Sequence, residues 1–266
     1  QRKIASVLAA YDELIEKNAR RIQILEDMAQ ALYREWFVEY RFPGHEDVEL
    51  VDSELGAIPM GWHVSTFGDA FQVVGGATPS TKCPEYWDGG TINWYTPSDL
   101  TRHGHMFIDK SSRRITQAGL DACSATLFPA GSVMMTSRAT LGVLAINTEP
   151  ACTNQGFITV LPNERLPAAF IYFLLASKAA EIEALASGAT FKEISKRSFR
   201  TIRFALPPVD LVTRFTKLTD PMLGLIRNLI RQNANLRATR DLLLPRLVSG
   251  EIDVSNLDID TEWLVA

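Results

Sequence analysis

The stretch that decides the fold is residues 4–36, IASVLAAYDELIEKNARRIQILEDMAQALYREW. Its apolar residues recur at alternating steps of four and three, which is the period of a coiled-coil seam. The members of this first seam are Ile4, Leu8, Tyr11, Ile15, Asn18, Ile22, Leu25, Ala29, Leu32 and Trp36. The pattern predicts a long helix that needs a partner helix to bury its apolar stripe.

A second copy of the pattern lies near the C-terminus. Shifting the first copy by 211 residues places Ile4 on Phe215 and Leu32 on Leu243. The members of this second seam are Leu211, Phe215, Leu218, Met222, Leu225, Leu229, Gln232, Leu236, Thr239 and Leu243. Each segment predicts a rod of about 50 Å, and the simplest partner for either rod is the other one, folded back antiparallel.

Two prolines bear on the limits of the second rod. Pro221 inside a helix would remove a hydrogen bond and cost ~3 kcal/mol. We therefore expect this rod to begin at Asp220, as the N-cap, with a separate short helix before it. Pro245 is expected to end or kink the rod at its other end.

The residues between the rods indicate a globular domain of α/β (α+β) class, with a mixed sheet and helices. Short β-type runs lie at 71–74, 91–95, 132–136, 143–146 and 157–161, and are followed by a helical stretch at 168–185 and a last strand at 202–206. The expected division is a first helix at 1–40, an acidic linker at 41–57, the domain at 58–206, a second helix at 207–250 and an acidic tail at 251–266.

Composition sets the broad class. With 46% apolar and 22% charged residues, the chain is typical of a soluble protein, and no apolar run approaches the ~20 residues that span a bilayer. The start at Gln1 has neither a signal-peptide pattern nor an initiator Met, so we expect a cytoplasmic chain cut from something longer. Cys83, Cys123 and Cys152 are too few and too widely spaced for a disulfide framework or a zinc site, and are expected to be reduced.

Charge is unevenly placed along the chain, although the net value is −4. Residues 1–57 hold 7 basic and 12 acidic side chains, residues 58–206 hold 13 and 11, and residues 207–266 hold 7 and 8. Only the middle domain is therefore net positive. Within it, residues 191–203 carry five basic side chains and one acid, and local clusters of this kind decide phosphate binding.

The first candidate site is the glycine-rich run 75–82, GGATPSTK. A nucleotide-binding P-loop needs Gly directly before the Lys, and Thr81 stands there instead. A glycine hairpin that exposes Thr78, Ser80 and Lys82 would offer donors to DNA phosphates and base edges. The alternative is a plain turn beside Trp87 and Trp94, which we favour as core residues.

The second and third candidates also fit DNA. In the loop 136–142, Arg138 suits a bidentate contact to guanine, with Thr140 beside it, although hairpin arginines are equally common as solvated residues. In the segment 190–203, four basic residues at mixed spacings predict a basic helical face for phosphates, with a merely solvated face as the alternative. They are Lys192, Lys196, Arg197 and Arg200.

No pattern argues for catalysis. The pair His103-x-His105 is a weak metal signal without a Cys or acidic partner at ligand spacing. The sequence has no nucleophile elbow, zinc-protease helix or dinucleotide fingerprint. We expect neither a catalytic nor a metal site.

An ordered set of motifs resembles the specificity subunit of type I restriction-modification enzymes. The motifs span nearly the whole chain. They are QRKIA at 1–5, residues 32–37, IPxGW at 58–62, GGxTPS at 75–80, YWxGGxIxW at 86–94, NQGF at 154–157, GxT at 188–190 and LPP at 206–208.

The resemblance implies a target recognition domain that reads one half of a split double-stranded DNA sequence, carried on spacer helices that act as a ruler. It also implies that methylation and cleavage belong to partner modification and restriction subunits. S-adenosylmethionine, ATP and Mg²⁺ are then expected only in those partners. The seam residues are expected to serve self-association and partner docking.

This chain departs from the family by having one recognition domain with a helix on each side. It is therefore expected to be either a natural half subunit or a C-terminal fragment, and the absence of Met favours the fragment. Two other functions stay open at this point, namely a stand-alone DNA methyltransferase or nuclease, and a structural coiled-coil adaptor.

Overall fold

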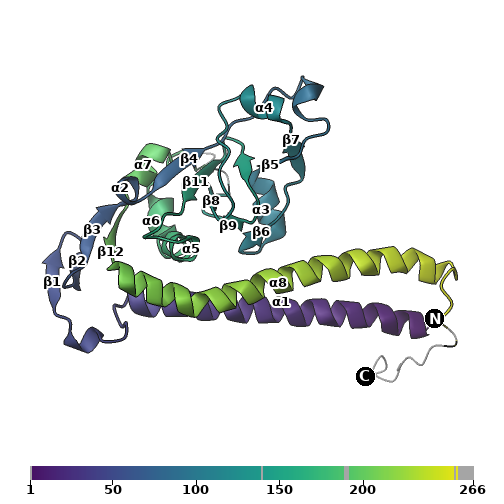
Figure 1. The fold of residues 1–266 in the computed structure, drawn as a ribbon, viewed down its shortest axis with the longest axis horizontal. Helices are drawn as coiled ribbons and strands as arrows, with labels where there is room; N and C mark the ends of the chain where they lie inside the picture. The colour runs from purple at the N-terminus through teal and green to yellow at the C-terminus, as the bar shows by residue number, and fades with distance from the viewer. Residues whose placement is uncertain (1, 139, 189–191, 255, 257–266) are drawn as a thin grey trace. The chain divides into compact units, whose positions relative to one another are not determined.

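The computed structural model describes residues 2–138, 140–188, 192–254 and 256. The chain is a mixed α/β protein with two compact units, formed by residues 1–29 with 220–266 and by residues 30–219 (Figure 1). Helices α1 (Arg2–Phe37) and α8 (Val209–Val248) each contribute to both units. This confirms the predicted fold class, a globular α/β (α+β) body with long helices at both chain ends.

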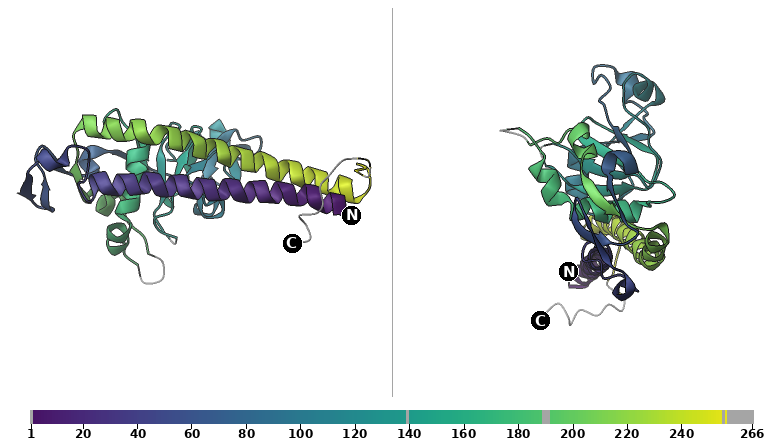
Figure 2. Two further views of the ribbon diagram at one scale, coloured as in Figure 1. Left: turned by 90° about the horizontal axis from the view of Figure 1, so that it is seen from below. Right: turned by 90° about the vertical axis from the view of Figure 1, so that its left-hand side faces the viewer.

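The first unit is an antiparallel pair formed by α1 and α8, which lie side by side in two views (Figures 1 and 2). The direction follows from two cross-helix bonds, because Asn18 contacts Asn233 while Asp12 contacts Arg240. Every predicted member of the first seam is buried or half-buried. The stripe on α1 is therefore the contact stripe.

The second seam was predicted one residue out of register beyond Phe215. Beyond Phe215, the stripe that α8 buries follows Thr219, Leu223, Ile226, Ile230 and Asn233. The predicted Leu218 and Leu225 are 49% and 47% exposed, and Gln232 and Thr239 are also exposed. Phe215 and Leu229 are buried, while Met222, Leu236 and Leu243 are half-buried. The error arises because adjacent apolar residues, as at 222–223, 225–226 and 229–230, let the same stripe be drawn in two registers.

The prediction that the second rod begins at Asp220 was wrong, because α8 runs through Pro221 without a break. Pro221 removes the donor that would reach the carbonyl of Lys217, and both residues are exposed, so water can satisfy that carbonyl. The helix also continues past Pro245 and ends three residues later at Val248.

The second unit is built on a five-stranded sheet in the order β4-β11-β8-β9-β6. The bounds are β4 Gln72–Gly75, β11 Phe157–Leu161, β8 Val133–Thr136, β9 Leu144–Asn147 and β6 Phe107–Ile108. A three-stranded sheet has β10 (Ala151–Thr153), β5 (Ile92–Tyr95) and β7 (Arg113–Ile115), and β12 (Arg203–Leu206) pairs with β3 (His63–Thr66). The predicted strands are present, whereas β6, β7 and β10 were missed because two or three residues give little periodicity. The four residues of β3 were missed because Val64 is their one strongly apolar member.

The segment 41–57 contains structure that the sequence pattern did not predict. A 3-10 turn, η1 (His45–Asp47), is followed by the hairpin of β1 (Leu50–Ser53) and β2 (Gly56–Pro59). The hydroxyl of Ser53 donates to the carbonyl of Gly56, whose φ of +89° suits glycine at this turn.

Short helices complete the second unit. They are α2 (Phe67–Ala70), η2 (Pro84–Tyr86), α3 (Pro97–His103), α4 (Gln117–Asp121), α5 (Ala168–Ser177), α6 (Ala179–Ala184) and α7 (Lys196–Arg200). The helix predicted at 168–185 is thus two helices, separated at Lys178, where the amide donates to the carbonyls of Leu174 and Leu175. Among the described residues, no helix combines the length and apolar character needed to cross a membrane.

Among the apolar groups that hold this unit together, two bear on the sheet and the helices. Beside the five-stranded sheet lies a cluster of Tyr95, Leu100, Ile108, Phe128, Met134, Ala145, Ala151 and Phe157. The second group is aromatic and joins the end of α1 to α5 and the start of α8. In it, the ring centroid of Phe37 lies 5.0 Å from that of Phe170 and 5.2 Å from that of Phe215. Burial of such rings is a large apolar contribution to folding.

Asp99 caps α3 and fastens it to the segment before β7. Its carboxylate accepts the Thr96 amide at 2.7 Å and the Ser112 amide at 2.9 Å. Although burial alone would raise the pKa of Asp99, hydrogen bonds from Ser112 and Thr96 hold it below its ordinary value.

We expect Asp99→Ala to lower the free energy of unfolding by ~1–3 kcal/mol, because a cap is lost and the amide of the half-buried Thr96 loses its acceptor. Since a lowered pKa stabilises the fold only while the group is ionised, the difference should be full at neutral pH and shrink below the ordinary value of 3.8. Urea unfolding of wild type and variant at neutral pH and again below pH 3.8 tests this. Asp88→Ala is the control, because Asp88 is exposed. A pH-independent difference would contradict the assigned role.

Candidate nucleic-acid interface

Three loops meet at one edge of the five-stranded sheet, which we call the loop edge. The loop 76–82 leaves the end of β4, the loop 137–143 joins β8 to β9, and residues 154–156 enter β11. The register fixes this arrangement, because Ile158 pairs with Gly75 and Phe157 pairs with Thr136. The loop edge thus contains Thr78, Ser80, Lys82, Arg138 and Thr140, which the sequence had assigned to DNA.

The loop 76–82 is a crossing between two sheets and not the predicted hairpin, since it leads from β4 to β5 in the three-stranded sheet. Two indoles anchor it. The Trp94 Nε1 donates to the carbonyl of Ala77 at 2.9 Å, and the Trp87 Nε1 donates to the carbonyl of Ser80 at 3.0 Å. Trp94 is buried, as expected for a core residue, and both indoles also position the loop.

Gly76 is required by close packing in this loop. A Cβ there would lie 2.0 Å from the carbonyl oxygen of Thr153, a backbone atom that cannot rotate away. The Ala77 amide donates to that same carbonyl at 2.9 Å. The glycine therefore lets the loop pack against the end of β10, and the hydroxyls of Thr78 and Ser80 remain exposed.

Gln155 joins the loops and was missed as a site residue in the sequence. Its side-chain oxygen accepts the Thr78 hydroxyl at 2.7 Å, and its carbonyl accepts Arg138 Nη2 at 3.0 Å. The side chain is exposed. An exposed amide suits bidentate pairing with adenine, and the only sequence signal was its place in a polar turn between two strand-like runs.

Arg138 lies at the centre of the loop edge. Its Nε is 3.7 Å from a carboxylate oxygen of Glu193, and its side chain is 40% exposed. The neighbouring backbone joins two loops, because the Ser137 amide donates to the Gly156 carbonyl while the Ile194 amide donates to that of Ser137. Thr140 is exposed on the same loop, and its carbonyl accepts the Thr136 hydroxyl. Residue 139 lies outside the described residues.

The basic segment does not form the predicted continuous helical face. Helix α7 covers only Lys196–Arg200, and Thr190 lies outside the described residues. Lys192, which lies before the helix, is 2.7 Å from a carboxylate oxygen of Glu183, and Arg203 forms an ion pair with Glu54. Arg200 donates to the carbonyl of Val73. The predicted face of four basic residues fails because Ser195 caps a new short helix that Lys192 precedes, so that the four do not share one helical surface.

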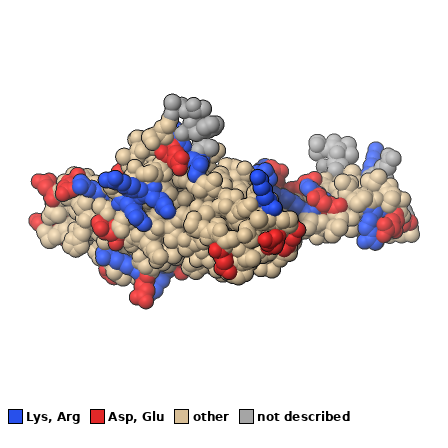
Figure 3. All heavy atoms as spheres, turned by 90° about the horizontal axis from the view of Figure 1, so that it is seen from above, with Lys and Arg blue, Asp and Glu red and all other residues tan. Residues whose placement is uncertain are grey.

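Lys196 and Arg197 are exposed side chains of α7 that, within the described ranges, have no acidic partner at ion-pair distance, and the equally exposed Arg200 donates to the carbonyl of Val73. The ammonium of Lys196 lies 2.9 Å from the position that a Cβ on Gly75 would occupy, so Lys196 borders the loop edge. On the face drawn in Figure 3, basic side chains gather in separate groups with acidic ones between them. Local groups, and not a continuous basic surface, therefore offer contacts to phosphates.

Other polar features of the described residues do not form a second site. No group of three or more His, Cys, Asp and Glu side chains is placed to hold a metal ion within those ranges. Cys152 is buried, and burial raises the pKa of its thiol to about 12, which keeps it protonated at neutral pH. His103 makes a 2.6 Å hydrogen bond with the carbonyl of Phe107.

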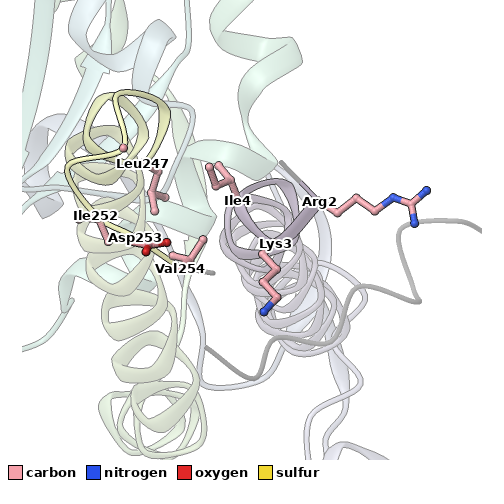
Figure 4. A pocket seen from close by; sticks show the side chains of 8 residues that line it. Arg2, Lys3, Ile4, Leu247, Ile252, Asp253 and Val254 are labelled. Atoms are coloured by element: carbon pink, nitrogen blue, oxygen red, sulfur yellow. The ribbon is translucent and has the colours of Figure 1, made fainter. Parts of the chain in front are cut away.

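A hollow of about 630 Å³ lies at the end of the helix pair (Figure 4). Its lining mixes Ile4, Leu247 and Val254 with the charged Arg2, Lys3 and Asp253. Arg2 extends away from the other labelled side chains in this view. We assign the hollow to packing of the helix ends.

Comparison with known proteins places this architecture in a family. A family model described as "Type I restriction modification DNA specificity domain" matches residues 59–218. The chain belongs to this family. The match includes the loop edge and all the strands of the two larger sheets.

Curated relatives are named as specificity subunits of type I restriction enzymes. The chain is 33% identical over 189 residues to the type I restriction enzyme MjaIX specificity subunit of Methanocaldococcus jannaschii, a match that covers 70% of this chain and 44% of the relative. It is 25% identical over 310 residues to the HindI specificity subunit of Haemophilus influenzae, covering 95% and 67%. The chain thus spans between 44% and 67% of the length of these two relatives.

Solved structures share the fold. The S subunit of a type I restriction-modification system from M. genitalium aligns with a TM-score of 0.62 at 16% identity, over 92% of this chain and 59% of that one. The HsdS subunit from Thermoanaerobacter tengcongensis aligns with a TM-score of 0.51 at 17% identity, over 94% and 57%.

Proposed function

We propose that this chain recognises double-stranded DNA sequence-specifically as a specificity subunit, or part of one, in a type I restriction-modification complex. The observation that carries the proposal is the loop edge, where hydroxyls, an amide and a guanidinium from three loops converge beside Lys196. Arg138 and Gln155 are the groups suited to base edges, while Lys82, Lys196 and Arg197 are suited to phosphates. Lys192 would join them by exchanging the Glu183 carboxylate for a phosphate. Thr78, Ser80 and Thr140 supply shorter hydrogen-bonding groups around them.

The helices supply spacing and docking in this proposal. Residues 1–40 and 207–250 are the spacer helices, residues 41–57 the linker, residues 58–206 the target recognition domain, and residues 251–266 a tail. Apolar side chains that the pair leaves exposed, such as Ile24 and Met28, offer contacts to modification (methyltransferase) subunits or to a second copy of the chain. Restriction subunits join through the complex, which acts in the cytoplasm.

Catalysis is assigned to the partners. The modification subunit would bind S-adenosylmethionine and methylate DNA, and the restriction subunit would use ATP and Mg²⁺. The chain alone should therefore neither methylate nor cleave DNA until those subunits are added. Mapping methylated adenines in source cells with and without the gene tests the whole proposal, because loss of one split motif is expected. Methyl transfer by the purified chain alone would reject it.

Lys196→Ala should weaken binding to cognate and random DNA alike, because a phosphate contact carries no sequence information. We expect the slope of log affinity against log salt to fall by about one unit. Lys110→Ala is the matched control, since Lys110 is exposed and follows β6 at the opposite end of the sheet. Equal slopes for wild type and Lys196→Ala would remove Lys196 from the interface.

A further inference from the structure

A pair of asparagines interrupts the apolar seam between α1 and α8. Asn18 is 2% exposed and Asn233 is 1% exposed. The neighbouring seam positions on α1 are Ile15 and Ile22, and those on α8 are Ile230 and Leu229. Two buried amides in such surroundings are unfavourable unless they are hydrogen-bonded.

Both amides find their partners on the opposite helix. Asn18 Nδ2 donates to Asn233 Oδ1 at 3.0 Å, and Asn233 Nδ2 donates to the carbonyl of Ile15 at 3.1 Å. These bonds exist in one axial register. If one helix slid by a turn, both amides would face apolar side chains and lose their partners, which costs more than never having had them.

Within the first unit, the rest of the seam discriminates registers weakly, whereas in the second unit the rings of Phe37 and Phe215 also hold the two helices together. The adjacent apolar pairs Met222–Leu223, Leu225–Ile226 and Leu229–Ile230 allow α8 to present a stripe in more than one register. The Arg240–Asp12 ion pair also crosses the helices, but its side chains are 31% and 59% exposed, where solvent and salt weaken it. A single buried Asn is a known means of fixing register at some cost in stability.

We infer that the Asn18–Asn233 pair determines spacing specificity, because it fixes the register of the two spacer helices and so the number of base pairs between the two half-sites. The inference has two steps. The first, that the asparagine pair fixes the register, concerns the helix pair alone. The second, that the register sets the spacing of the half-sites, rests on the proposed function. The pair acts on DNA through the helices, so these are positioning residues and not base readers.

The first measurement concerns register without DNA. Spin labels at Leu14 and Leu242, which are 44% and 71% exposed, report the axial distance between the helices in a chain with its three cysteines replaced. The wild type should give one narrow distance distribution. The double variant Asn18→Leu/Asn233→Leu should give a second population displaced by about 5 to 10 Å, as expected for a slide of one or two turns.

Controls separate register from simple loss of a polar group. Thr219→Val removes an equally buried hydroxyl whose bonds go to Phe215 and Thr216 of its own helix, and should keep one distance. If the Leu variant does not fold, Asn18→Ala/Asn233→Ala serves in its place. A single unshifted distance in a folded double variant overturns the inference, whatever the DNA result.

The second measurement is the spacer length of methylated sites in cells that carry the double variant with its methyltransferase. We expect the same half-site bases with more than one spacer length. A shifted distance distribution with an unchanged single spacer would overturn the step from register to spacing and refute the ruler role in the proposed function. An unshifted distribution refutes the register step instead, so the two failures are distinguishable.

Discussion

Phe215→Ala should lower the free energy of unfolding of the second unit by ~3–5 kcal/mol, the range for removing a fully buried aromatic ring. Phe215 has no exposed surface, and its ring packs against those of Tyr33, Trp36, Phe37 and Phe173. The loss combines the transfer of the ring to water with a cavity among rings that cannot all move inward. Urea unfolding followed by tryptophan fluorescence measures it, because the Trp36 ring centroid lies 6.3 Å from that of Phe215.

Leu218→Ala is the matched control, and it tests the helix register. The sequence pattern placed Leu218 and Phe215 in one seam, whereas the structure leaves Leu218 49% exposed. Its truncation should therefore change stability by no more than about 0.5 kcal/mol, as for ordinary surface substitutions. A loss as large as that of Phe215→Ala would support the predicted seam and contradict the observed one.

These two residues show what the sequence could determine about the helices. The period of the apolar pattern from Ile4 to Trp36 predicted a long helix and an antiparallel partner, because burial of a stripe is a local requirement that periodicity records. The register along α8 was not determined, since the choice between Leu225 and Ile226 depends on which residue meets α1. The sequence also did not determine the cost of Pro221 inside the helix. That cost depends on whether the carbonyl left without its donor is exposed to water, which only the structure shows.

The candidate site was predictable in its chemistry and not in its assembly. Arg138 and Thr78 were singled out as residue types that suit DNA, on loops bounded by strand-like runs. Their common partner Gln155 was missed because it lies 77 residues from Thr78 in the chain, and only the strand order brings the two together. Lys192 and Arg203 were grouped with Lys196 by sequence proximity, but each makes an ion pair with an acid, Glu183 and Glu54 respectively.

Arg138→Ala should weaken binding to the cognate half-site by ~1–3 kcal/mol, or roughly 5- to 150-fold, and relax preference at one base pair. The guanidinium already holds the Gln155 carbonyl at 3.0 Å, with its Nε 3.7 Å from Glu193, so it is positioned between two loops before DNA arrives. Binding a guanine would give the guanidinium the neutral O6 and N7 acceptors of the base in place of the Glu193 carboxylate.

Arg138→Lys separates base reading from charge. It keeps the charge but loses the planar fork of two fixed donors, so it should fall towards Arg138→Ala on cognate DNA and resemble wild type on random DNA. The measurement is competition binding with the cognate half-site and its single-base variants, alongside thermal unfolding of each protein. A base reader loses discrimination at one position while the unfolding midpoint stays near wild type. If Arg138 instead only holds Gln155 in place, both substitutions would weaken every sequence alike and lower the midpoint, and the base-reading assignment would pass to Gln155, whose exposed amide lies on the same edge.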